Sequence, residues 1–215
     1  QYLFFLAKAY ELNPADEQAA INALRACVEN RRADIANLLL QKILKSFNSN
    51  AEIWHLTGVL FLSQQRYPEG YQALNKAREL APDDLRIQVS IATLELVSSD
   101  PAISKRGREK LEALRSKPEF FAAATQSLAE ATSVQDPAGA IKLWDEVITR
   151  SPDNWPARLR RLDLKRKLDA NTSQAELDAL WKIAKDAQQR RDLIVRTGSW
   201  LGPEAAVRRL DTLDA

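Results

Sequence analysis

Residues 51–84 read AEIWHLTGVLFLSQQRYPEGYQALNKARELAPDD, and small and large residues alternate along them in a pattern typical of paired helices. Small residues recur at Gly58, Gly70 and Ala77, and large apolar residues fall between them. Residues of these two sizes let two antiparallel helices approach closely and fill the space between layers. Pro82 cannot continue a helix and therefore ends the second one. The stretch as a whole predicts one helix–turn–helix unit.

Sites that end a helix recur along the chain at Pro14, Asn48, Pro82, Pro118 and Pro152. The interval equals the length of the unit at 51–84 throughout, except that two extra residues precede Pro118. A fixed period of this length, about 34 residues, is the sequence signature of a repeat architecture. We expect the two extra residues to lie within Ser98–Ala102, where Asp100-Pro101 predicts the start of the next helix.

The period divides the chain into helix pairs that we predict form a single solenoid over residues 1–215. It consists of an orphan second helix at 1–16, five repeats at about 17–50, 51–84, 85–120, 121–154 and 155–188, and a capping helix pair at 189–215. Ser173 and Glu176 have the spacing of a capping box, which predicts a helix start there. In the last pair we expect a turn at Thr197–Gly202. No stretch shows the alternation typical of a strand.

The unit at 51–84 resembles the tetratricopeptide repeat (TPR), whose signature places Trp, Leu-Gly, Tyr, Ala, Phe, Ala and Pro at fixed offsets. The residues that match this signature are Trp54, Gly58, Tyr67, Ala77 and Pro82. Phe61 replaces a Tyr, and Thr57 stands where the signature has Leu. The resemblance implies an all-α, right-handed superhelical solenoid. It also implies that the first helix of each unit lines a concave groove that binds a partner peptide or helix.

Carried over by offset, the resemblance gives a list of groove residues. They are Asn22, Arg25, His55, Val59, Leu62, Val89, Ser90, Thr93, Gln126, Arg160, Asp163 and Arg166. The central part of this groove is apolar and neutral, with Arg25 and Arg86 as isolated charges, unlike the Lys, Asn and Arg clamp by which some TPR proteins hold a carboxylate. A neutral groove suits an amphipathic helix or an extended apolar segment.

Composition limits the remaining classes of function. The chain is 45% hydrophobic and 28% charged with a net charge of +2, which is neither a disordered nor a membrane composition. Its near balance of charge gives no reason to expect nucleic acid as a partner. A single Cys forms no internal disulfide, and one His with one Cys are too few for a structural zinc site. We therefore expect no metal and no cofactor.

Catalytic motifs are equally scarce. A histidine-based site would have to use His55, and we interpret it as a groove or surface residue. Cys27 is interpreted as a buried thiol. Gly198–Gly202 has its serine in the wrong place for a nucleophile elbow. The sequence thus favours a non-enzymatic protein-interaction scaffold.

A basic patch follows residue 157, with Arg158, Arg161, Lys165 and Lys167 on one predicted helix. We interpret it either as a solvated surface or as a docking patch for an acidic partner. The other end of the chain begins with apolar residues, Tyr2–Leu6, that lack a helix partner. This open end could support homo-oligomers, so a structural or oligomerisation segment of a larger envelope or assembly protein is the alternative function.

The sequence contains no Met and no run of about 18 apolar residues that could span a bilayer. We expect a fragment of a longer protein that extends N-terminally with further repeats. The cytoplasm is favoured as its compartment, and the bacterial periplasm or envelope is retained if an anchor lies outside this sequence.

Overall fold

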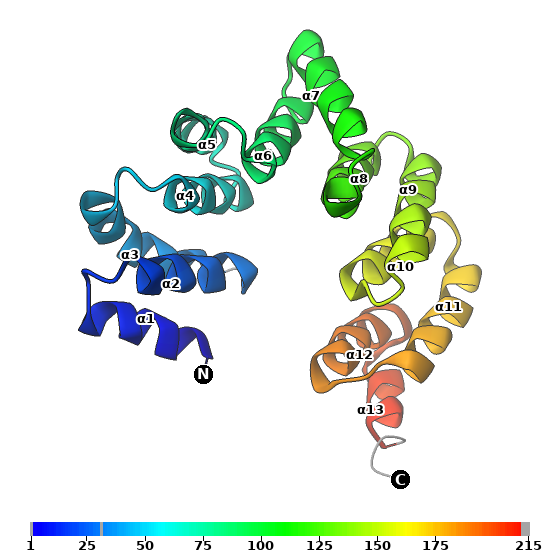
Figure 1. Cartoon of the computed structure of the whole chain (residues 1–215). Helices are drawn as coiled ribbons and strands as arrows, with labels where there is room; N and C mark the ends of the chain where they lie inside the picture. The colour runs from blue at the N-terminus through cyan, green and yellow to red at the C-terminus, as the bar shows by residue number, and fades with distance from the viewer. Residues whose placement is uncertain (1, 31, 212–215) are drawn as a thin grey trace. The chain divides into compact units, whose positions relative to one another are not determined.

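The computed structural model describes residues 2–30 and 32–211, and within them it has thirteen α-helices and no strand. The all-α helical-repeat architecture is thereby confirmed. The chain divides into two compact units, Gln1–Ala124 and Thr125–Ala215. In each unit the helices follow one another as hairpins (Figure 1).

The N-terminal unit comprises α1 (Tyr2–Leu12), α2 (Glu17–Glu29), α3 (Ala33–Ser46), α4 (Ala51–Ser63), α5 (Tyr67–Leu80), α6 (Leu85–Leu96), α7 (Pro101–Leu114) and the first half of α8 (Pro118–Thr132). The C-terminal unit comprises the rest of α8, α9 (Pro137–Arg150), α10 (Trp155–Leu168), α11 (Ala170–Ile183), α12 (Ala187–Leu201) and α13 (Pro203–Asp211). We call α2, α4, α6, α8, α10 and α12 first helices and the helices that follow them second helices.

Capping residues start the first helices of the N-terminal unit at a fixed interval. Asp16, Asn50 and Asp84 are N-caps at equal spacing along the sequence, and each side chain accepts a hydrogen bond from a backbone N–H of the first turn. Such a cap satisfies a donor that the helix leaves unpaired. Asp100 and Asp136 cap α7 and α9 in front of a first-turn proline, which confirms the helix start predicted at Asp100-Pro101.

Small residues bring α4 and α5 together. A Cβ atom on Gly58 would lie 2.6 Å from Leu74 Cγ, and one on Gly70 would lie 2.9 Å from Leu62 Cδ2. Gly58 and Gly70 are both buried, so the two helices approach more closely than side chains would allow. This confirms the role predicted for both glycines.

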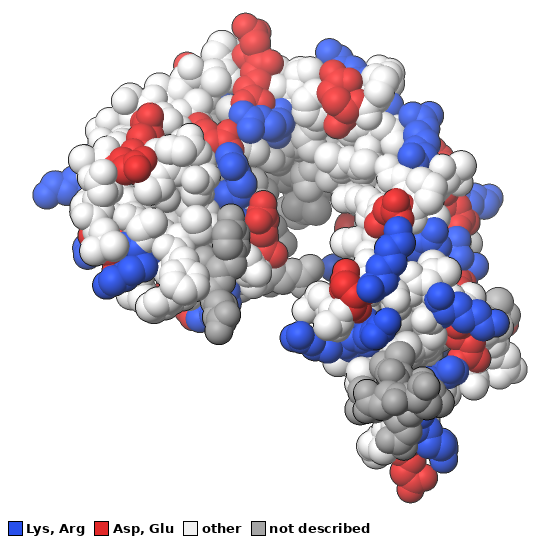
Figure 2. Space-filling model, turned by 60° about the horizontal axis from the view of Figure 1, so that its bottom comes forward, with Lys and Arg blue, Asp and Glu red and all other residues white. Residues whose placement is uncertain are grey.

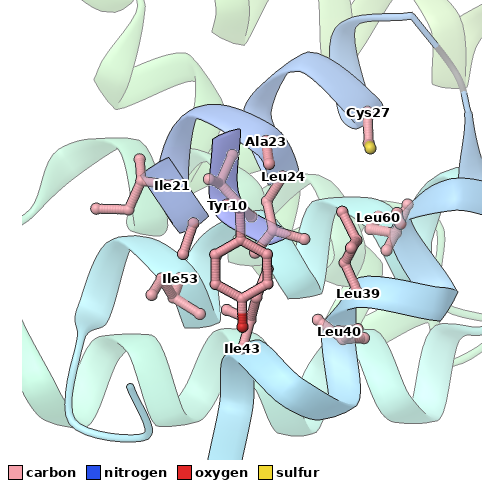
Figure 3. Close-up of a cluster of buried hydrophobic side chains, with 13 residues drawn as sticks. Tyr10, Ile21, Ala23, Leu24, Cys27, Leu39, Leu40, Ile43, Ile53 and Leu60 are labelled. Atoms are coloured by element: carbon pink, nitrogen blue, oxygen red, sulfur yellow. The ribbon is translucent and has the colours of Figure 1, made fainter. Parts of the chain in front are cut away.

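One core cluster joins α1, α2, α3 and α4. The Tyr10 ring on α1 is 1% exposed and lies among Leu24, Ile43 and Ile53 (Figure 3). Helix α1 therefore buries an aromatic side chain in the same core as the first complete hairpin. Cys27 belongs to this cluster and is fully buried, as predicted.

The C-terminal unit has a cluster of its own, centred on α10, α11 and α12. Its buried members are Trp155, Leu159, Leu162, Leu177, Leu180 and Leu193. The Trp155 indole donates a 3.1 Å hydrogen bond to Asp192 on α12, so its polar end is satisfied while the ring packs inward.

Three local predictions were wrong. Helix α7 starts at Pro101, one regular period after the first residue of α5, so the two extra residues do not lie at Ser98–Ala102. They lie between α7 and α9, because Pro118 begins the 15-residue helix α8 instead of ending a helix.

Ser173 does not start a helix, since α11 already begins at Ala170 behind the cap Asp169. The turn predicted at Thr197–Gly202 is confined to Gly202, whose φ of 93° is one that glycine tolerates. Residues 212–215, the end of the predicted capping helix pair, lie outside the described residues.

Candidate functional site

Ion pairs join the first helices of the N-terminal unit. Arg25 Nη2 on α2 lies 3.1 Å from Glu52 Oε1 on α4. Arg86 Nη1 on α6 lies 2.8 Å from Glu52 Oε2, and its Nη2 lies 2.6 Å from Asp84 Oδ2. The Glu52 side chain is 18% exposed and is held between the two arginines. The hydrogen bond from Arg86 lowers the pKa of Asp84 and keeps it ionised.

A second link between these helices runs through the only histidine. His55 Nε2 and Ser90 Oγ share a hydrogen bond of 2.9 Å between α4 and α6. Burial lowers the pKa of His55, an effect larger than the opposing influence of Glu52. The imidazole is therefore neutral at pH 7. It acts as a polar contact between helices and has no carboxylate or thiol hydrogen-bonded to it among the described residues.

The other predicted groove residues of this unit divide into two groups. Val59 and Thr93 are half-buried on α4 and α6, and Asn22 lines a small pocket with Arg25. Leu62 instead packs against the buried cluster of α5 and α6, and Val89 is only 8% exposed. We use the name first-helix face for the surface made by Asn22, Arg25, Glu52, His55, Val59, Arg86, Ser90 and Thr93.

The C-terminal unit repeats this arrangement with other residues. Arg160 on α10 lies 2.9 Å from Glu130 on α8. Asp163 accepts two hydrogen bonds from Arg196 on α12, of 2.8 and 2.7 Å. The Arg166 guanidinium lies 5.5 Å from the centre of the Trp200 ring, also on α12. Gln126 is half-buried on α8. Its predicted role in binding, like that of Arg160, Asp163 and Arg166, stays a prediction.

The predicted basic patch is largely engaged within the chain. Arg161 pairs with Asp145 on α9 at 2.6 Å and with Glu176 on α11. Lys165 also pairs with Glu176, at 2.9 Å. These contacts tie three helices together.

Of the other two patch residues, Arg158 donates to the Pro152 carbonyl and Lys167 is exposed. Figure 2, which draws one face, shows acidic atoms beside the basic ones over the C-terminal helices. The docking role of the patch stays a prediction.

Sequence reasoning missed two features. It treated Arg25 and Arg86 as isolated charges, which is wrong, because Glu52 pairs with both. No local signal pointed to these pairs, since Glu52 lies on α4 whereas the two arginines lie on α2 and α6. Sequence reasoning also overlooked the second-helix side of the N-terminal unit, where Tyr67 and Tyr71 line a pocket of 610 Å³.

Reactive thiols, metal sites and membrane-spanning helices are the other kinds of functional feature to consider. Burial, with a smaller effect of the Asp34 charge, raises the pKa of the Cys27 thiol, which makes it a poor nucleophile. Within residues 2–30 and 32–211, no three His, Cys, Asp or Glu side chains gather in a way that could hold a metal ion. Over the same residues, no helix has the length and apolar character needed to cross a bilayer.

The paired helices, their close-packed glycines and the contacts between successive first helices define a TPR protein, a class that serves as a protein-interaction scaffold and is typically non-catalytic. Residues 33–158, from α3 into α10, match the family described as the cytochrome c-type biogenesis protein H TPR domain. The match covers more than half of the chain, and the chain belongs to this family.

Solved structures give weaker likenesses. PilF of Pseudomonas aeruginosa is 21% identical with a TM-score of 0.48, covering 89% of this chain and 86% of PilF. The Naa15/Naa10 complex bound to HypK-THB contains a chain with 17% identity and a TM-score of 0.42, covering 98% of this chain and 33% of that one. The P58(IPK) TPR domain has 18% identity and a TM-score of 0.36, covering 97% and 60%. A comparison with curated proteins gave no match.

Proposed function

We propose that this scaffold holds a segment of apocytochrome c, the cytochrome polypeptide before haem attachment, on the first-helix face. The family name supports this choice of partner, since it places the relatives in cytochrome c-type biogenesis. A polypeptide without its haem lacks the centre of its core and exposes apolar segments. Such segments need a scaffold that binds an amphipathic helix or an extended peptide.

One observation carries the proposal: three helices bring half-buried apolar and neutral polar groups to the same surface, beside an ion-pair chain. Val59 and Thr93 supply apolar contact, and the His55–Ser90 pair supplies hydrogen-bonding capacity. The arginines on Glu52 fix the spacing of the helices, so the surface is organised before a partner arrives. A preorganised surface loses less entropy on binding.

The test replaces Val59 and Thr93 together by glutamate. An apolar segment that binds this neutral face would remove water from the two new carboxylates, which costs free energy. We therefore expect the affinity for haem-free cytochrome c to fall by about two orders of magnitude. Isothermal titration calorimetry would measure the affinity, and far-ultraviolet circular dichroism should show unchanged helix content.

The matched control is Gln41→Glu with Gln72→Glu, which adds the same charge at exposed positions of α3 and α5. We expect it to bind as the unmodified chain does. If the variant at Val59 and Thr93 binds normally, the first-helix face is not the site. If the unmodified chain does not bind haem-free cytochrome c, the choice of partner is wrong.

A second candidate function, self-association, is favoured by the N-terminal helix. Phe4 and Phe5 on α1 are 66% and 65% exposed, and their rings form an edge-to-face pair at 5.9 Å. The side chains of Tyr2 and Leu3, which completed the predicted apolar end, lie outside the described ones. Sedimentation of the chain with Phe4→Ser and Phe5→Ser tests this function. A concentration-dependent dimer that this double variant abolishes supports the oligomerisation role, whereas a monomeric unmodified chain excludes it.

A further inference from the structure

Two pockets lie along one side of α6, between the second helices α5 and α7. The first has a volume of 610 Å³ and includes Glu95 in its wall, and the second has a volume of 440 Å³ and includes Lys110. Lys110 Nζ lies 2.9 Å from Glu95 Oε2, so the pockets adjoin at this ion pair. We call the two together the second-helix groove.

The floor and walls of this groove follow helical geometry. Leu85, Gln88 and Ile91 of α6 form the floor of the second pocket, and Leu94 of the same helix lies in the floor of the first. Helix α6 packs against both α5 and α7, which supply the walls. The floor is about 14 Å long, because it runs from Leu85 to Leu94 and each residue adds a rise of about 1.5 Å. That length suits a bound helix of about two to three turns.

One half of the groove is apolar and open. Tyr67, Tyr71 and Val97 line the first pocket and are 45%, 44% and 50% exposed. Exposed aromatic and aliphatic side chains that gather in a concave surface are typical of a binding site for an apolar anchor.

The charges of the groove are strongly one-sided. Four cations, Arg78, Arg106, Lys110 and Lys117, line it together with one carboxylate, Glu95. Glu95 is 5% exposed and already accepts hydrogen bonds from Lys110 and Arg106. Among the described residues, Arg78 and Lys117 form no ion pair with any carboxylate. The accessible charge of the groove is therefore positive, although the whole chain has a net charge of only +2.

We propose that the second-helix groove binds an acidic amphipathic helix of a partner protein, with an apolar side chain against Tyr67 and Tyr71 and carboxylates against Arg78 and Lys117. Charge complementarity selects an acidic segment over a neutral one. This surface shares α6 with the first-helix face but uses other residues of that helix together with α5 and α7, and its charge differs, so it serves a second partner segment.

A synthetic peptide is the probe. It is a stapled helix of about three turns, with a leucine and phenylalanine stripe flanked by glutamates, labelled with fluorescein for anisotropy. A second peptide replaces each glutamate by glutamine. We expect the glutamine peptide to bind about tenfold more weakly, and we expect added salt to weaken only the glutamate peptide.

Variants locate the site. Arg78→Glu with Lys117→Glu should weaken the glutamate peptide by at least about tenfold. The matched control, Lys42→Glu with Lys45→Glu, makes the same change in net charge at exposed positions of α3 and should weaken it by less than about threefold. Tyr71→Ala should weaken both peptides several-fold, because it removes apolar contact and not charge.

Equal binding of the two peptides would overturn the proposal, and so would equal effects of the two charge-reversal variants. Loss of peptide binding in the Val59 and Thr93 glutamate variant alone would place the peptide on the first-helix face instead. Phosphatidylglycerol vesicles that bind through Arg78 and Lys117, with no binding of the peptide, would assign the groove to a membrane surface. None of these outcomes depends on whether apocytochrome c binds the first-helix face.

Discussion

Gly107 lies at a close approach of α6 and α7, and replacing it by alanine tests the packing of the repeat. A Cβ atom at this position would lie 2.4 Å from the Leu96 nitrogen and 2.6 Å from the Ala92 carbonyl oxygen. Both atoms belong to the backbone of α6 and cannot move aside as a flexible side chain would. Because ordinary contact begins at 3.4 Å, the two helices would have to separate by about 1 Å.

The expected cost follows from two opposing effects. Overpacking of this kind costs up to about 3 kcal/mol, here because separation loosens the packing of buried Leu111 and Leu114. Alanine in a helix interior is favoured over glycine by about 1 kcal/mol. We therefore expect Gly107→Ala to lower the free energy of unfolding by about 2 kcal/mol.

Gly198→Ala is the matched control. A Cβ atom on Gly198 would have as its nearest neighbour Ala206 Cβ at 3.5 Å, an ordinary contact. We expect this variant to gain up to about 1 kcal/mol, so the two substitutions should differ in sign.

Urea unfolding followed by circular dichroism measures both free energies. Hydrogen exchange should show the loss in Gly107→Ala concentrated in α6 and α7, because repeats unfold in local units. A Gly107→Ala protein as stable as the unmodified chain would show that α6 and α7 do not pack as closely as the structure has them.

Three further predictions concern buried groups. Burial alone would raise the pKa of Glu95, but hydrogen bonds from Lys110 and Arg106 lower it, so its contribution to stability is present above pH 4.5 and is lost as the pH falls below. Glu95→Gln should flatten that acid dependence in urea titrations. Burial lowers the pKa of His55, so the unfolded state binds more protons and stability falls as the pH drops below 6.5. His55→Asn should remove this dependence, and an unchanged pH profile would contradict the assigned burial. Cys27 is fully buried, so a thiol reagent should label it slowly in buffer and rapidly in urea.

The sequence predicted the helical repeat well because its signals are local. Gly58, Gly70 and Pro82 all act within one hairpin. In the structure the two glycines lie where α4 and α5 approach closely, and Pro82 follows the end of α5, as predicted. The caps at Asp16 and Asn50 repeat with the same interval, although only the helix ends were used to find it.

Contacts between repeats were harder to predict. Arg25 and Glu52 lie on different hairpins with the whole of α3 between them in the sequence, and nothing near either one indicates the other. Pro118 misled for a different reason, because a proline after a helix either ends that helix or begins the next one. The proline by itself does not distinguish the two, and in the structure Pro118 begins α8.

Charge shows most clearly why neighbouring helices must be considered together. Arg161 and Lys165 stood out because they follow one another on a single helix, yet Glu176 on the next helix pairs with both. Arg78 and Lys117 are far apart in the sequence, yet they line one groove and have no carboxylate partner within the described part of the chain. In a repeat protein, a cation is available to a partner only when the adjacent helix leaves it unpaired. The second-helix groove meets that condition at both residues, whereas the predicted basic patch does not meet it at Arg161 or Lys165.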